Sequence, residues 1–388
     1  MDTRDGRVMR ARMLLEVGRW PDAFHELSRV LRERPDDVEA GCLLARCYDL
    51  AGDPPGTVAA TGRVLAVAPG HEWALRQRAM ALVAMRRRRE ALLCARAAVA
   101  AAPHEWRTHA TLTEVLLHQP GVRALVFARD AADTVLRLAP DEADAHVVDA
   151  QVCLRAGELT LARRACVRAL ELDPQNQAAL HDLAVVDLRR ERLGRAGRGF
   201  SAALALAPGD RTTGTAHGQG ARAVLWRLYD VLAAATVGHL VVFALVAGTL
   251  GPWRRPLALG AAVLFLAAFA LLFRWVWRAQ PLAVRLKVRA DRRQPAVLLW
   301  AAAVVAAAVA SVLGGYRPAE DSVAGNLAIL GVMITVVTLA VRLYGLVTGW
   351  VSTVVVRLLY RTALLLHGGR RRTGRRGDAA GAGAGARG

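Results

Sequence analysis

Residues 150–174 read AQVCLRAGELTLARRACVRALELDP, and this stretch shows how the first half of the chain is built. Small residues recur at helical spacing on both sides of Gly157, and Pro174 closes the stretch. A glycine is favoured where a helix ends in a left-handed residue, and a proline cannot continue the helix that precedes it. Small side chains also let two helices approach closely. The stretch therefore predicts a pair of packed helices joined by a turn at Gly157.

Prolines recur along the first half of the chain at about the length of that pair. They are separated by 34, 34, 37, 34 and 34 residues and are Pro35, Pro69, Pro103, Pro140, Pro174 and Pro208. A period of this size is typical of stacked helix-turn-helix units. The three additional residues of the longer interval lie near 118–121. Residues 1–210 are therefore predicted to be an all-α solenoid of about six units.

The unit resembles the tetratricopeptide repeat (TPR), and the resemblance covers about residues 4–210. The fifth unit carries the family pattern at Ala150, Gly157, Ala162, Ala169 and Pro174. The second unit departs from it, with Thr57 and Thr61 where alanine and a large apolar residue are usual. The resemblance implies that the first helices of the pairs line a groove that binds a peptide or helix of another protein.

Polar and aromatic side chains on the first helices are the candidates for this groove. They are Arg12, Glu39, Arg46, Trp73, Arg76, Arg107, Glu114, Gln151 and His181. Several arginines beside an aromatic ring predict a partner with an acidic or amphipathic segment. Family members that clamp a carboxylate terminus use Lys and Asn there, whereas residues 1–210 contain no Lys and only Asn176. The four arginines 86–89 lie at a predicted turn and are expected to form a solvated face.

Residues 211–388 have a different composition. A Gly- and Thr-rich linker at 211–222 precedes four apolar runs, at about residues 231–250, 256–273, 295–313 and 322–341. Each run approaches the ~20 residues that cross a hydrocarbon core, and none holds more than one ionisable side chain. The sequence thus predicts a membrane domain over residues 223–366, with about four transmembrane helices in contact with membrane lipids. A basic, Gly- and Ala-rich disordered tail is expected over 367–388.

Charge divides at the same border. Residues 1–210 carry a net charge of +2, whereas 211–388 carry +17 of the total of +19. The basic balance therefore belongs to the membrane part and does not indicate nucleic-acid binding. The second loop and the tail hold twelve basic residues and the other two loops hold three, so the positive-inside rule predicts a cell-membrane protein with a cytoplasmic array and tail.

Residues 343–366 allow two interpretations. The segment is apolar but is interrupted by Arg357 and Arg361. A fifth crossing would carry the five arginines between 370 and 376 to the outside, whereas a helix along the inner membrane interface would not. The helix along the interface costs less free energy, and a fifth crossing remains the alternative interpretation.

Signals for chemistry are few, so no catalytic, cofactor-binding or metal site is predicted, and the protein is expected not to be an enzyme. His104, Glu105 and His109 have the spacing H-E-x-x-x-H, which places the histidines about 140° apart on a helix and not on one face. His239 and Arg342 are ionisable residues within or at the end of the apolar runs, and such groups indicate a functional site. The alternatives are a hydrogen bond from His239 to a neighbouring helix and an Arg342 side chain that reaches the inner headgroups. The leading hypothesis is a membrane-anchored interaction scaffold. The alternative is a small channel or transporter subunit that its repeats regulate.

Overall fold

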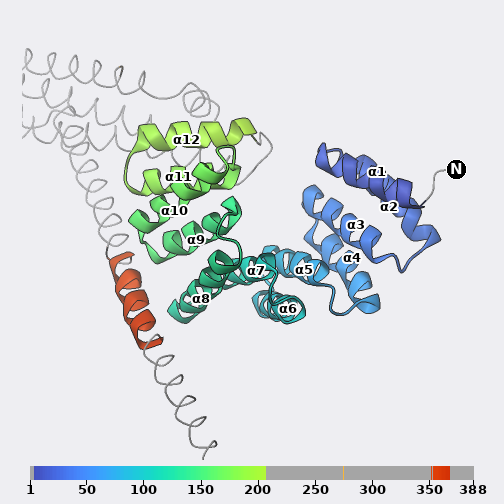
Figure 1. Cartoon of the computed structure of the whole chain (residues 1–388), viewed down its shortest axis with the longest axis horizontal. Coiled ribbons are helices and arrows are strands. Elements are labelled where there is room, and N and C mark those ends of the chain that lie inside the picture. The colour runs from blue at the N-terminus through green and yellow to red at the C-terminus, as the bar shows by residue number, and fades with distance from the viewer. Residues whose placement is uncertain (1–3, 207–273, 275–350, 352, 368–388) are drawn as a thin grey trace, which may run out of the picture. The chain divides into compact units, whose positions relative to one another are not determined.

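The computed structural model describes residues 4–206, 274, 351 and 353–367. Helices make up the described chain up to residue 206, and Figure 1 shows them in order. They are α1 (Arg4–Glu16), α2 (Trp20–Glu33), α3 (Val38–Ala51), α4 (Pro54–Val67), α5 (Glu72–Ala84), α6 (Arg88–Ala101), α7 (Trp106–Leu117), α8 (Val122–Leu138), α9 (Ala143–Ala156), α10 (Leu159–Leu172), α11 (Gln177–Arg189) and α12 (Leu193–Leu206). Helices α1–α10 and residues 355–367 belong to one compact unit, and α11 and α12 belong to a second.

The helices form six pairs with the predicted period. The first helices of the pairs begin at Arg4, Val38, Glu72, Trp106, Ala143 and Gln177, so their starts are 34 residues apart except for 37 between the fourth and the fifth. The additional residues are taken up mainly by α8, which has 17 residues against 14 in each of the other second helices, whereas the turn 118–121 before it has four. The prediction of an all-α repeat solenoid is confirmed.

The prolines explain where the second helices end. The residue before each of the first five prolines is not helical. These residues have φ between −141° and −130° and ψ between 65° and 98°, and they are Arg34, Ala68, Ala102, Ala139 and Asp173. A proline ring clashes with a helical residue before it and moves that residue into an extended conformation. Each second helix therefore ends two residues before its proline.

The turn inside a pair uses a left-handed residue. Gly18, Gly52 and Gly157 have φ of 75°, 71° and 76°, as predicted for glycines that end a helix. Arg86 and Glu191 hold the equivalent place in their own repeats and have φ of 60°. A side chain in this conformation costs about 1–2 kcal/mol. These two turns therefore keep the repeat geometry at a local cost in stability.

The threonines of the second repeat are buried without loss of hydrogen bonding. Thr61 is fully buried, and its Oγ1 donates to the carbonyl oxygen of Thr57 at 2.7 Å. Thr57 Oγ1 donates in the same way to the carbonyl oxygen of Asp53 at 3.1 Å. A bond to the preceding turn satisfies a hydroxyl inside a helix pair. The departure from the family pattern therefore leaves the α3–α4 packing intact.

Residues 353–367 are also helical, and Figure 1 shows this segment in red. We call it the C-terminal helix. Tyr360 on this helix is 3% exposed and packs with Leu125, Val126 and Val152 of the array. The sequence placed residues 343–366 at the membrane and did not indicate a contact with the repeats.

The predicted linker, the four apolar runs, His239, Arg342 and the tail beyond residue 367 lie outside the described residues. The helices that the structure does describe include none with the length and apolar character needed to cross a bilayer. The membrane domain therefore stays a prediction from the sequence.

Candidate functional site: the inner face of the array

The first helices of the pairs form a continuous row. Helix α1 contacts α3, α3 contacts α5, α5 contacts α7 and α7 contacts α9. We use the name inner face for a set of polar and aromatic residues on these helices, together with Glu105, which caps α7. Its members are Arg12, Glu39, Arg46, Asp49, Glu72, Trp73, Arg76, Glu105, Arg107, Glu114 and Gln151. All the predicted groove residues except His181 are among them.

An ion pair links the first two repeats. The guanidinium of Arg12 on α1 donates to Oε1 of Glu39 on α3. Their side chains are 51% and 43% exposed, so water screens the pair. Exposed ion pairs of this kind contribute about 0–1 kcal/mol. The pair therefore adds little stability to the array. Its main effect is to neutralise the charge of Arg12, which the sequence predicted to bind an acidic group of the partner.

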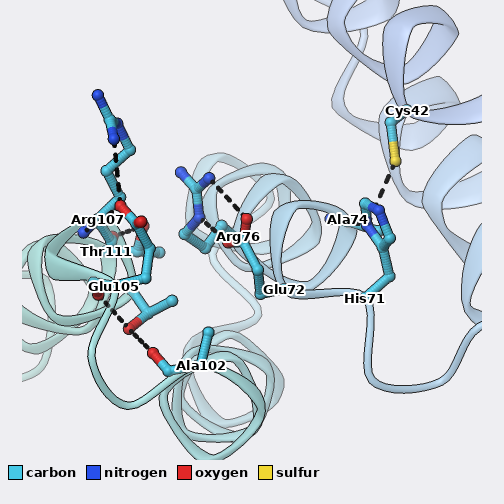
Figure 2. A network of polar contacts seen from close by, with 10 residues as sticks. Cys42, His71, Glu72, Ala74, Arg76, Ala102, Glu105, Arg107 and Thr111 are labelled. Carbon is cyan, nitrogen blue, oxygen red and sulfur yellow. Dashed lines mark hydrogen bonds and ion pairs between the residues drawn. The ribbon is translucent and has the colours of Figure 1, made fainter. Parts of the chain in front are cut away.

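The third repeat holds a tighter pair, shown in Figure 2. Arg76 Nε donates to Glu72 Oε2 at 2.6 Å, and Arg76 Nη2 donates to Glu72 Oε1 at 3.4 Å. The two side chains are 19% and 32% exposed. A two-point contact at i,i+4 on one helix fixes the orientation of the guanidinium. The positive charge of Arg76 is therefore neutralised by Glu72 on the inner face.

Arg107 of the fourth repeat is also paired. Its Nη1 lies 3.2 Å from Glu105 Oε1, and its guanidinium lies 4.6 Å above the ring of Trp106. Glu105 begins α7 by accepting the backbone N–H of Arg107 at 3.3 Å (Figure 2). A cation on the face of a tryptophan is favourable. The helix cap, the ion pair and the ring thus hold one arginine in place.

Two carboxylates of the inner face lack such a counter-charge. Glu114 on α7 is half-buried, and burial raises the pKa of its carboxyl. His118 lowers that pKa by less than burial raises it, and Asp49 on α3 adds a smaller rise. Neither side-chain carboxylate forms a hydrogen bond or ion pair within the part of the chain that the structure describes.

Arg46 is the remaining cation of the row. It lies close to one helical turn before Asp49 and is exposed. It has no ion pair with any residue that the structure describes. The inner face therefore carries three neutralised arginines, one uncompensated arginine and an uncompensated pair of carboxylates. Its charge is mixed, where the sequence alone indicated an excess of arginine.

The other predicted groove residues have different surroundings. Trp73 is half-buried and packs against Cys42, Val64 and Ala74, so part of its ring belongs to the core. Gln151 is half-buried on α9. His181 lies on α11 in the second compact unit, where its Nδ1 is 3.1 Å from Asp182 Oδ1.

Sequence reasoning missed Glu72, Glu105 and Asp49. The spacing of Glu72 and Arg76 is a recognisable helix pair, and this signal could have identified the neutralised arginine. Glu105 could have been found as a helix-capping residue before α7. No sequence signal indicated Asp49, which influences Glu114 only through the stacking of repeats.

A hollow lies between α6, α7 and α8. Its volume is about 660 Å³, and its lining includes Arg96, Asp130, Asp133 and Arg137. His109, which sequence inspection rejected as a zinc ligand, also borders it, and its Nε2 lies 2.9 Å from the carbonyl oxygen of Pro103. Within the described residues no three His, Cys, Asp or Glu side chains are grouped so as to hold a metal ion.

Comparisons with known proteins agree with the repeat geometry. The tetratricopeptide repeat family matches residues 8–68 and 128–177. A search of curated proteins gave no match to this chain.

Similar solved structures include the APC/C heterotetramer Cut9–Hcn1, at 14% identity and a TM-score of 0.47 over 56% of this chain and 43% of that one. The matched part thus spans less than half of that protein. PilF of Pseudomonas aeruginosa is similar at 19% identity and a TM-score of 0.41, over 56% of this chain and 95% of that one. A tetratricopeptide repeat protein of Thermus thermophilus is similar at 22% identity and a TM-score of 0.34, over 56% and 98%.

The 34-residue period, the helix pairs and the family match lead to one conclusion. This chain contains tetratricopeptide repeats.

Proposed function

We propose that the protein is a membrane-anchored scaffold whose inner face binds a partner protein and holds it at the membrane. Tetratricopeptide repeats stack into extended surfaces that bind other proteins. The single observation that carries the proposal is a continuous row of first helices with polar, aromatic and uncompensated charged side chains along it. No step of this function requires a cofactor or a catalytic residue.

The charges of the inner face favour an amphipathic partner segment over a purely acidic one. Arg46 would bind an acidic side chain of the partner. The carboxylate of Asp49 or of Glu114 would bind a basic side chain, because neither has an ion pair within the described residues. Partner and inner face would thus be complementary through alternating charges, which give specificity as well as affinity.

Membrane anchoring rests on the four apolar runs and on the unequal distribution of basic residues. The C-terminal helix adds a geometric argument. The chain leaves the repeats after Leu206, and residues 355–367 pack against the repeats again. If the repeat array lies on one side of a bilayer, this return of the chain favours an even number of crossings, which supports four over five. The basic tail then lies on the cytoplasmic side with the array.

The proposal is tested by charge reversal on the inner face. The full chain, the double variant Arg46→Glu with Asp49→Arg, and the control Arg89→Glu are each isolated in membranes with their bound partner. A desolvated charge-assisted contact contributes about 1.5–3 kcal/mol, so the double variant should lose partner binding by about tenfold or more. Arg89 is exposed near the turn that begins α6, and its variant should bind as the wild type does.

If the double variant and the wild type bind equal amounts of the partner, the inner face is not the binding site. If the chain is recovered in the soluble fraction, it is not anchored in the membrane. Circular dichroism of both variants establishes that the helices are intact.

A further inference from the structure

The C-terminal helix is fixed to the array along one of its faces. Arg361 Nε donates to Glu158 Oε1 at 3.0 Å, and Arg357 Nη2 donates to the carbonyl oxygen of Gly157. At the end of the helix, His367 Nε2 lies 2.8 Å from Asp130 Oδ2. Tyr360 is buried between these contacts. The docked face therefore combines a buried aromatic with polar contacts to α8 and to the turn before α10.

The His367 ring contributes to the same docking. It lies edge-on to the ring of Phe127 on α8, with 5.7 Å between the ring centroids. Ala363 packs against the same cluster of array residues as Tyr360. Residues 360, 363 and 367 follow the three- and four-residue spacing of one helix face. The docked face thus runs along the helix for about two turns.

The opposite face of the C-terminal helix is apolar and uncovered. Leu358, Leu359, Leu365 and Leu366 are 58%, 51%, 76% and 72% exposed. At 100° per residue, these four leucines and Val355 lie within one sector of about 120°. The only polar residue in that sector is Thr362, whose hydroxyl donates to the carbonyl oxygen of Leu358 at 3.1 Å. The sector is thus almost entirely hydrocarbon.

Such a face needs a cover, because soluble proteins rarely expose a continuous apolar stripe of this kind. Two features of the chain favour a lipid surface. The fourth apolar run ends at Arg342, only 13 residues before Val355, so even an extended connection spans less than about 45 Å. The five arginines between 370 and 376 follow the helix directly and would be attracted to anionic lipid.

We propose that the C-terminal helix is a two-sided connector, which binds the repeat array with its Tyr360 face and lies in the headgroup region of an anionic membrane with its leucine face. The inference rests on the proposed membrane anchoring and adds to it. It implies that repeats four and five are held next to the bilayer, whereas an array joined only by its linker would be free to move away. A partner bound to the inner face would thereby be held at a fixed distance from the membrane surface.

The test uses the full chain in nanodiscs of phosphatidylcholine and phosphatidylglycerol at about 3:1, so that the surface is anionic. Single cysteines replace Leu358, Leu365 or, as the matched control, Leu93, which is an exposed leucine of α6 at 65%. Each is labelled with an environment-sensitive fluorophore near neutral pH. Burial raises the pKa of the Cys42 and Cys153 thiols to about 12, so these native cysteines will react slowly.

The expected result is that lipid-borne quenchers reduce the fluorescence at positions 358 and 365 several-fold more than at position 93. Equal quenching at the three positions, with the chain still resistant to alkaline extraction, would overturn the connector while leaving the membrane anchor in place. Extraction of the chain at alkaline pH would instead refute the anchor. A blue shift at 358 and 365 that grows with protein concentration and is not quenched by lipid would assign the face to a second copy of the chain and overturn the proposal.

Discussion

Removal of the Tyr360 ring should release the C-terminal helix from the array. Tyr360 is 3% exposed and packs with Leu125, Val126 and Val152. Truncation of a buried aromatic side chain to alanine costs about 3–5 kcal/mol. We take the lower value, about 3 kcal/mol, because this ring lies at the edge of the array. The undocking equilibrium in Tyr360→Ala should therefore rise about a hundredfold.

The assay is amide hydrogen exchange of the full chain, read on peptides that cover residues 353–367. Exchange there should accelerate by up to the same factor, because docked amides exchange through opening of the contact. Leu93→Ala is the matched control, since this side chain of α6 is 65% exposed and is not part of the Tyr360 cluster, so the variant should change the exchange little. Equal exchange in both variants would show that the helix is not held by its Tyr360 face.

pH provides a further check on the same contact. Burial raises the pKa of the Tyr360 phenol, and Arg129 lowers it by less. The stabilisation is then complete below the ordinary tyrosine pKa and is lost as the pH rises through the raised value. The contribution of Tyr360 to the protection of residues 353–367 should thus be constant near neutral pH and decline only under alkaline conditions.

Further variants test the repeat geometry in the array itself. Arg86→Gly should stabilise the array by about 1 kcal/mol in urea unfolding because it relieves the left-handed φ of 60°, and destabilisation would contradict this account of the turn. Gly56→Ala should destabilise α4 by about 1–3 kcal/mol, since the new Cβ would clash with the Tyr48 ring. Gly62→Ala in the same helix meets only the end of an arginine and should be neutral or stabilising by up to about 1 kcal/mol, so equal effects of the two glycine variants would refute the packing. Glu114→Gln should stabilise the array at neutral pH and not in acid, because the raised pKa of Glu114 penalises only its charged form, and a pH-independent effect would argue against that burial.

The repeat fold was readable from the sequence because its determinants are local. Proline moves the preceding residue out of the helix, and glycine at Gly18, Gly52 and Gly157 adopts a left-handed turn, whatever the rest of the chain does. Arg86 and Glu191 show the limit of this reasoning, because stacking imposes the same turn on residues that do not favour it.

The helices that carry the inner-face residues were predictable, but the charge balance of those residues was not. The residues on the first helices follow from the repeat period, whereas the neutral or charged state of each depends on side chains from neighbouring turns and repeats. Glu39 reaches Arg12 from the next repeat, and Asp49 influences Glu114 from two repeats away. The docking of the C-terminal helix could not be read from the sequence for the same reason. Its partners Asp130 and Glu158 are separated from His367 and Arg361 by 237 and 203 residues.

Site-specific photocrosslinking can decide whether the inner face recruits a protein to the membrane. A photoreactive residue is placed in the full chain at Arg46 on the inner face or at the exposed Leu93 of α6, and membranes are irradiated before the crosslinked proteins are identified. The account predicts that position 46 crosslinks a distinct partner protein in the membrane fraction and that position 93 does not. Crosslinking of that partner from position 93 alone, or only in the soluble fraction, would contradict it.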